Sequence, residues 1–254
     1  MIDYTKLTKE KAEVSYDTTY ISTSCPRTEA TLGTIEKDAS GAFGKHAREP
    51  FRGYKIFKLL SAKKFDTVLD IGAGKLEATQ EFIKSGKIVD ISEFEDSYYL
   101  AESNFDMSLI RNTHIGDINT INIPERYDAI WASHILEHQL NPNIFLKKLN
   151  SLLKEGGYLA IVIPPRKPFI VGGHVSMWNG GLLLYHLILA GFDCSDAQLL
   201  QYDYNIGVVL KKKTINPYPE INYDLGDLHI LKKYFPMEIT EGFNGDLMEI
   251  NISA

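Results

Sequence analysis

Two glycines and an aspartate stand where an apolar stretch of the chain ends. Residues 67–74 read Thr-Val-Leu-Asp-Ile-Gly-Ala-Gly, so that Asp70 is followed closely by Gly72 and Gly74. The pattern predicts a buried strand that ends in a tight turn, because glycine accepts backbone conformations that other residues avoid. A bare turn of this kind allows the backbone to approach a ligand closely. We predict that this ligand is a nucleoside.

The residues after the turn argue against a dinucleotide. The fingerprint G-x-G-x-x-G places a third glycine near the pyrophosphate, and Glu77 occupies that position here. Its carboxylate would bring negative charge towards a phosphate, and Asp70 already lies at the strand end. Two carboxylates suit a ligand that carries ammonium and hydroxyl groups, and S-adenosylmethionine (SAM) is such a ligand.

Further carboxylates follow the next two predicted strands. A carboxylate after the second strand can accept hydrogen bonds from both ribose hydroxyls of an adenosine. Asp90 and Glu93 both qualify; Glu93 has the better distance from the first strand and is followed by Phe94, which could pack on adenine. After the third strand, Asp117 is placed to accept the adenine amine, with the Ile118 backbone at the ring edge.

Histidines are the candidates for acid–base chemistry. His134 and His138 follow the fourth predicted strand at the same edge as the glycine turn, and His174 lies in a glycine-containing segment after the fifth. A general base is needed if the group to be modified is a hydroxyl or an ammonium. We expect His134 or His174 to serve, with His138 and Trp178 at the substrate and Tyr185 as a further pocket wall; a purely structural histidine is the alternative for each.

One motif competes with this interpretation. The residues His134, Glu137 and His138 match the inverted zinc-protease pattern His-x-x-Glu-His, which would place two zinc ligands and a general base on one helix. Five-residue patterns recur by chance, and this one directly follows a buried strand. We therefore expect neither zinc hydrolysis nor a metal site.

The elements that must position these residues alternate between strand and helix. We expect a doubly wound, Rossmann-like α/β fold whose sheet has seven strands, mostly parallel, with one of the seven antiparallel. Helices are predicted at 46–61, 75–84, 97–104, from Asn141 or Asn143 to Gly156, and at 181–190; strands at 67–71, 87–94, 112–115, 127–132, 158–163, 192–201 and 206–211.

Three regions are expected in this order: an N-terminal arm or lid at 1–45, a nucleoside-binding domain at 46–213, and a C-terminal extension at 214–254. The arm is polar and carries Tyr16, Tyr20 and Arg27, which could close over a substrate. The extension is rich in aromatic residues and proline. Such content predicts packing against the domain or a neighbouring subunit, so a homodimer is a candidate assembly.

Composition narrows the classes of function. The 254 residues carry a net charge of -6, and their basic residues are scattered, which argues against a nucleic-acid surface. Cys25 and Cys194 match no metal or redox spacing, so reduced thiols and a cytoplasmic location are expected. We find no signal-peptide core and no apolar run long enough to span a bilayer.

Taken together, the motifs VLDIGAG, GDI, YDAIWASHILEH and LLKEGGYLAIVIPP resemble the class I SAM-dependent methyltransferases, specifically the small-molecule type that includes quinone-biosynthesis C-methyltransferases. The resemblance covers about residues 66–165 and continues more loosely to Lys213. One departure is Leu76, which stands where many members carry a third glycine. The resemblance implies SAM as cofactor, with cofactor contacts from Asp70, Gly72, Ala73, Gly74, Asp90 or Glu93, Phe94, Asp117, Ile118 and Ser133.

The methyl acceptor is less constrained than the donor. The polar Tyr, Arg and His flanks and the lack of an obvious apolar lid favour an oxygen or nitrogen of a small polar molecule. We expect a sugar, a surface-glycan precursor of polysaccharide biosynthesis, or a small amine. The alternative is a catalytically silent SAM-binding subunit or regulator.

Overall fold

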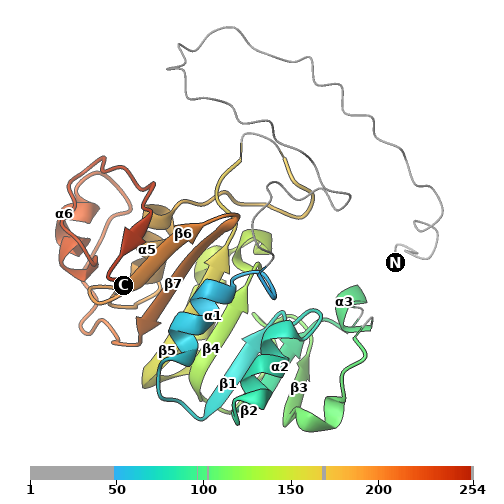
Figure 1. Cartoon of the computed structure of the whole chain (residues 1–254). Coiled ribbons are helices and arrows are strands. Elements are labelled where there is room, and N and C mark those ends of the chain that lie inside the picture. The colour runs from blue at the N-terminus through green and yellow to red at the C-terminus, as the bar shows by residue number, and fades with distance from the viewer. Residues whose placement is uncertain (1–48, 96, 102, 168–169, 253–254) are drawn as a thin grey trace, which may run out of the picture. The chain divides into compact units, whose positions relative to one another are not determined.

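The computed structural model describes residues 49–95, 97–101, 103–167 and 170–252, and every structural statement below concerns these residues. The predicted N-terminal arm, with Tyr16, Tyr20 and Arg27, lies outside them. The described chain folds around one sheet of eight strands (Figure 1).

The order of strands across the sheet is β3-β2-β1-β4-β5-β7-β6-β8. In this order, every pair of neighbouring strands from β3 to β5 is parallel. Strand β7 is antiparallel to both of its neighbours, β5 and β6, and β8 is antiparallel to β6. The strands are β1 (Thr67–Ile71), β2 (Ile88–Glu93), β3 (Asn112–Ile115), β4 (Tyr127–Ser133), β5 (Leu153–Ile163), β6 (Gln198–Tyr202), β7 (Asn205–Lys211) and β8 (Glu249–Ile250).

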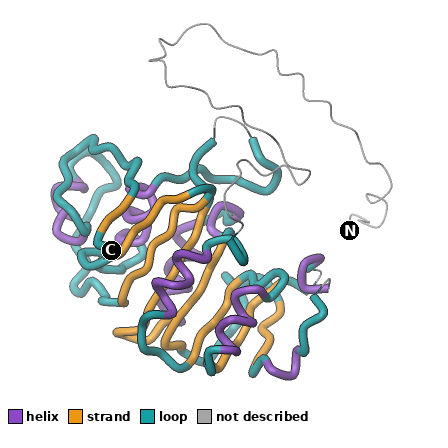
Figure 2. The backbone as a smooth tube through the Cα atoms, viewed as in Figure 1, coloured by secondary structure: helices purple, strands orange, loops and turns teal. Residues whose placement is uncertain are grey.

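Helices cover the sheet, and α1 and α2 lie on one face of it (Figures 1 and 2). Within the described ranges no helix combines the length and the apolar character needed to cross a lipid bilayer. The α-helices are α1 (Tyr54–Ser61), α2 (Glu77–Lys84), α3 (Tyr98–Ala101), α4 (Pro142–Leu152), α5 (Gly180–Leu189) and α6 (Asp227–Leu231), and the short 3-10 helices are η2 (Met107–Leu109), η3 (Leu136–His138) and η4 (Lys232–Tyr234).

Successive residues of the central strands enter two different cores. Val68 of β1 belongs to the core that contains Phe57 and Phe82 of α1 and α2, whereas its neighbour Leu69 belongs to the core that contains Leu149 of α4. Side chains alternate between the faces of a strand, and helices cover both faces of a parallel sheet. This two-sided burial is why the strands read as continuous apolar runs in the sequence.

The predicted Rossmann-like α/β class is confirmed, with differences in detail. The sheet has eight strands where seven were expected, because Glu249–Ile250 of the C-terminal extension pairs with β6. Among described residues the first helix begins only at Tyr54, since Gly53 before it has a φ of 82°. Strand β6 begins at Gln198 and not at Phe192, because the intervening residues turn at Cys194, whose carbonyl accepts from Ala197 N.

Candidate functional site

A cavity of about 780 Å³ opens at the carboxyl ends of β1, β2 and β4. Strand β1 has β2 on one side and β4 on the other, so this edge includes the switch point at which ligands bind in open α/β sheets. The volume lies in the range of small-molecule and cofactor sites. Its walls include seven residues that the sequence placed around the cofactor: Gly72, Gly74, Glu93, Phe94, Asp117, Ile118 and Ser133.

The glycine turn is shaped so that only glycine fits. Gly72 has a φ of 66°, and a Cβ there would lie 2.0 Å from Ile135 Cδ1. Gly74 has a φ of 53°. Leu76, which replaces the third glycine of many relatives, keeps a left-handed backbone with a φ of 63° while its side chain is fully buried. The backbone course expected of a glycine at this position is therefore retained by a leucine.

Glu93 is the carboxylate of β2 that faces the cavity. Its Oε2 accepts a hydrogen bond from Gly74 N at 2.9 Å, which ties the end of β2 to the glycine turn. Its Oε1 accepts from Phe94 N at 3.1 Å. The Phe94 side chain is 54% exposed at the same wall, free to cover a flat ring. One bond to each oxygen leaves Glu93 with acceptor capacity for a ligand.

Asp90, the other candidate on β2, lies inside the sheet. Its Oδ1 and Oδ2 accept from the Arg111 guanidinium at 2.8 and 2.7 Å. Asn112 donates from its backbone and its side chain, and Tyr127 Oη donates at 2.7 Å. Burial acts to raise the pKa of Asp90, but these hydrogen bonds, that of Arg111 first, outweigh it and hold the pKa below its ordinary value. Asp90 does not line the cavity, and its acceptor positions are taken.

Asp70 is buried behind the glycine turn and does not line the cavity either. Its Oδ2 accepts from Thr79 Oγ1 of α2 at 2.6 Å. Burial raises the pKa of Asp70 to about 7, although the Thr79 hydrogen bond opposes this; the negative charge of Glu93 adds to the rise. Asp70 thus links β1 to α2 beneath the turn. Ala73 packs against the core on the α1 and α2 side and is also absent from the cavity wall.

Asp117 follows β3 at the far wall of the cavity. Its Oδ1 accepts from the backbone N and the side-chain Nδ2 of Asn119, both at 2.9 Å. The neighbouring Ile118 is 6% exposed and belongs to the core. This turn holds Oδ1 of Asp117 in place, whereas Oδ2 accepts no hydrogen bond from the described residues. Asn119, Ser92 and Tyr99 also line the cavity, and no periodic pattern in the sequence singles them out.

His134 and His138 lie at the mouth of the cavity, next to β4. His134 has a φ of 56°, a conformation that costs a non-glycine residue energy and that clusters at functional sites. Its Nε2 is 3.0 Å from Asn205 Oδ1. His138 Nδ1 is 2.8 Å from the carbonyl oxygen of Gly173. The two rings are therefore held from two other segments, β7 and the loop after β5.

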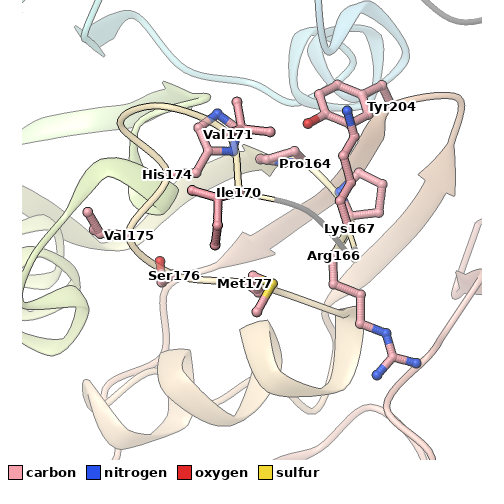
Figure 3. Close-up of a pocket in the computed structure, with 11 residues that line it drawn as sticks. Pro164, Arg166, Lys167, Ile170, Val171, His174, Val175, Ser176, Met177 and Tyr204 are labelled. Carbon is pink, nitrogen blue, oxygen red and sulfur yellow. The ribbon is translucent and has the colours of Figure 1, made fainter. Parts of the chain in front are cut away.

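His174 lines a second, smaller cavity formed by the loop after β5 (Figure 3). Its ring meets that of His138 edge to face, with centroids 4.9 Å apart, so the two cavities adjoin at this histidine pair. Lys167 Nζ lies 3.9 Å from the centre of the Tyr204 ring on the opposite side. In Figure 3 the Arg166 side chain points away from His174, and its guanidinium pairs with Asp246 at 2.5 Å. Burial lowers the pKa of His174.

Glu137 is a functional candidate that the sequence interpretation set aside. Its side chain is 0% exposed, yet among the described residues neither carboxylate oxygen has a hydrogen-bond partner. Oε1 lies 3.3 Å from His134 Nδ1 and 3.8 Å from His138 Nε2. The His-x-x-Glu-His pattern was the available signal, but it does not sit on one regular α-helix as the protease pattern would: only Leu136–His138 form a 3-10 turn.

Trp178 is part of the core more than of a cavity. It is 2% exposed, donates from Nε1 to Ser176 Oγ at 2.8 Å, and packs edge to face on His186. It contributes to two surface depressions, of about 530 and 280 Å³, that share no residue with the cavity at the glycine turn. The larger one shares Arg166, Lys167 and Met177 with the cavity that His174 lines, so a contact of Trp178 with the substrate stays a prediction.

The fold and the glycine turn define the class of protein. A family model described as a methyltransferase domain matches residues 43–199, which is more than half of the chain. The chain belongs to this methyltransferase family, and the predicted membership in the class I SAM-dependent methyltransferases is confirmed. With the family, SAM is confirmed as the cofactor. A sequence comparison with curated proteins found no match.

Solved structures share the fold at low sequence identity. A methyltransferase of Haloferax volcanii, described as putative and solved with the Trm112 activator, superposes with a TM-score of 0.53 at 13% identity, over 63% of this chain and 88% of the other. The 1,6-didemethyltoxoflavin-N1-methyltransferase of Burkholderia thailandensis, solved with S-adenosylhomocysteine, gives 0.53 at 18% identity, over 63% and 77%. A Nostoc punctiforme protein described as a putative O-methyltransferase gives 0.52 at 16%, over 62% and 55%.

Proposed function

We propose that this protein transfers a methyl group from SAM to an oxygen or nitrogen of a small polar acceptor. The observation that carries the proposal is the cavity at the carboxyl edge, where a glycine turn and the carboxylate of Glu93 face the same space. The groups that line the cavity suit SAM. The carboxylates of Glu93 and Asp117 can accept hydrogen bonds from hydroxyl and amine groups, and the absence of a side chain at Gly72 lets a ligand approach the backbone. Glu93 is assigned to the ribose, because the oxygens of Asp90 already hold Arg111, Asn112 and Tyr127.

When bound, SAM supplies an activated methyl group on a sulfonium. The protein then has to align donor and acceptor and keep water away. Phe94 and Ile118 supply apolar wall on the adenine side of the cavity. His134 and His138 stand at its mouth, towards the smaller cavity that His174 lines. We assign the acceptor to this junction, where an imidazole nitrogen can take a proton from a hydroxyl or ammonium.

Hydrogen-bonding groups at the junction support a small polar acceptor. His138 and His174 provide these groups, which a sugar, a glycan precursor or a small amine could use, while proline and aliphatic side chains form much of the wall of the smaller cavity. Two of the superposed proteins, which act on oxygen or nitrogen by their descriptions, are compatible with either atom. The alternative of a silent SAM-binding subunit is favoured by nothing in the geometry, since the cavity continues to side chains capable of proton transfer. A homodimer and a cytoplasmic location stay predictions.

Calorimetric titration with S-adenosylhomocysteine tests the cofactor site. We expect Glu93→Ala to weaken binding roughly ten- to a hundredfold, which corresponds to about 1.5–3 kcal/mol for a lost charge-assisted hydrogen bond. Glu95→Ala removes an exposed carboxylate two residues away that does not line the cavity, and it is the matched control. Equal affinities for the Glu93 and Glu95 variants would refute the ribose assignment.

Turnover tests the reaction itself. Purified protein is incubated with methyl-labelled SAM and pooled sugar nucleotides, phosphosugars and small amines, and transfer of label to one pool is the expected result. Tight binding of S-adenosylhomocysteine without transfer to any pool would favour the silent subunit over the enzyme.

A further inference from the structure

Four side chains that the fold gathers beside the cavity form a cluster. Glu137 and His138 lie on η3, His134 lies two residues before η3, and His174 comes from the loop after β5. One ligand atom from each of Glu137, His138 and His174 can be chosen so that all three lie within 4.8 Å of one another. At the centre is the fully buried Glu137, whose two oxygens have no hydrogen-bond partner among the described residues.

In His134 and His138, one ring nitrogen is hydrogen-bonded to a group outside the cluster and the other faces Glu137. The first hydrogen bond determines whether the nitrogen that faces Glu137 carries a hydrogen or a lone pair. A carbonyl oxygen only accepts, so His138 Nδ1 must donate to Gly173, and a neutral His138 then carries its lone pair on Nε2. In the same way, His134 Nε2 donates to Asn205 Oδ1, which leaves the lone pair on Nδ1. These two lone-pair nitrogens lie 3.8 and 3.3 Å from Glu137 Oε1. Three acceptors thus converge on one buried point.

Such a convergence favours a bound cation, because a buried carboxylate costs several kcal/mol unless a cation or a proton compensates it. Histidines that bind metals almost always donate their second ring nitrogen to a carbonyl, carboxylate or water, as His138 does to Gly173. We propose that Glu137, His138 and His174 bind a divalent transition-metal ion.

The donor set and its spacing fit zinc best. Two imidazoles and one carboxylate with an open fourth position are the ligands of catalytic zinc sites. Zinc bonds of about 2.0–2.1 Å in a tetrahedron separate the ligand atoms by about 3.3 Å. The 3.8 Å between His138 Nε2 and Glu137 Oε1 comes close to this value. His138 has a side chain that is 42% exposed, so the open position is reached from the cavity side.

The ion would lie where the two cavities adjoin, beside the acceptor position of the proposed function. There it would bind an acceptor oxygen and lower the pKa of that hydroxyl, which removes the need for a separate strong base. This role depends on the proposed function, but the binding of the ion does not.

Equilibrium dialysis of the full, tag-free chain against zinc, after removal of metals with a chelator, tests the site. The expected result is one equivalent of zinc in the wild-type protein. Cobalt in place of zinc should show the visible absorption of a four-coordinate site. His138→Ala, His174→Ala and Glu137→Gln should each weaken binding by more than about tenfold. His229→Ala, which removes an exposed imidazole from α6, should bind as the wild type does.

Circular dichroism identifies any variant that fails to fold, and His138→Ala, at a half-exposed position, is the variant expected to stay folded. Zinc uptake well below one equivalent, or equal affinities for His138→Ala, His174→Ala and His229→Ala, would overturn the proposal and leave a proton as the shared cation. Titration with S-adenosylhomocysteine on the same samples separates the two proposals: intact nucleoside binding without zinc refutes the metal site alone, and zinc binding without nucleoside binding refutes the cofactor site alone.

Discussion

Asp90 and Glu137 are both carboxylates with 0% exposure, and their surroundings are opposite. Asp90, in the middle of the sheet, accepts hydrogen bonds from Arg111, Asn112 and Tyr127. Glu137, at the carboxyl edge, accepts none from the described residues. A buried polar group whose partners are complete stabilises the fold, whereas one without partners is maintained at a cost. The difference shows which of the two carboxylates has capacity left to bind a ligand.

Asp70 lies between these two extremes. It has a single side-chain donor, Thr79, and it is as deeply buried as the others. Correspondingly, the pKa of Asp90 is held low by its donors, whereas burial raises that of Asp70 to about 7. The pKa values of Asp90 and Asp70 therefore differ in direction because Asp90 has several hydrogen-bond donors that oppose the effect of burial, whereas Asp70 has one side-chain donor.

The largest effect is expected from Asp90→Ala. Removing one partner of a buried ion pair leaves the others unsatisfied, so the free energy of unfolding should fall by about 3–5 kcal/mol in urea titrations. Glu137→Gln in metal-free protein should leave the free energy of unfolding unchanged or raise it, because the substitution removes the cost of burying a carboxylate that has no hydrogen-bond partner among the described residues. Similar losses in both variants would contradict the contrast between the two sites.

A smaller effect is expected from Gly72→Ala at the carboxyl edge. The new Cβ must displace Ile135 in addition to straining a φ of 66°, so the free energy of unfolding should fall by about 2–4 kcal/mol. Gly86→Ala at the opposite edge is the matched control: its φ is 74°, but nothing lies within 4 Å of a Cβ there. Its loss should be only about 1–2 kcal/mol. The double variant Gly72→Ala/Ile135→Ala should be more stable than the sum of the two single losses predicts, because the clash is gone; additive losses would show that the contact with Ile135 is not the source of the effect.

The most gradual effect is the pH dependence that Asp70 contributes. In the unfolded chain its pKa is near 3.8, and in the folded protein it is about 7, so between these values the folded state holds the extra proton. Stability from this group is therefore present at low pH and lost as the pH rises to about 7, at no more than about 1.4 kcal/mol per pH unit. Asp70→Asn should flatten this part of the curve in urea titrations between pH 5 and 7.5. An unchanged slope would show that Asp70 is ionised in the fold.

The sequence predicted the strands well because most of them are buried on both faces. Val68, Leu69 and Ile71 are apolar whichever core they enter, so the strand is recognisable without knowing its neighbours. The eighth strand, Glu249–Ile250, was missed because two residues form a strand only through pairing with β6, which is a long-range contact.

For the site, the positions of carboxylates after strands were predictable but their partners were not. The choice between Asp90 and Glu93 depends on Arg111 and Tyr127, which reach Asp90 from elsewhere in the chain. The approach of His174 to Glu137 and His138 likewise depends on the course of the loop after β5. Local spacing carries none of this information, and the His-x-x-Glu-His pattern was for that reason assigned to chance.

Strand β8 also covers part of the edge that β6 would otherwise form. Without it, β6 would present a row of unpaired backbone groups, and such borders invite pairing with other chains. Gln201 N, for example, donates to Met248 O at 2.7 Å just before β8. By pairing with β6, the C-terminal extension therefore protects the sheet edge from aggregation. Fusions or truncations near residue 248 should lower the yield of monodisperse protein, although this position is distant from the glycine turn.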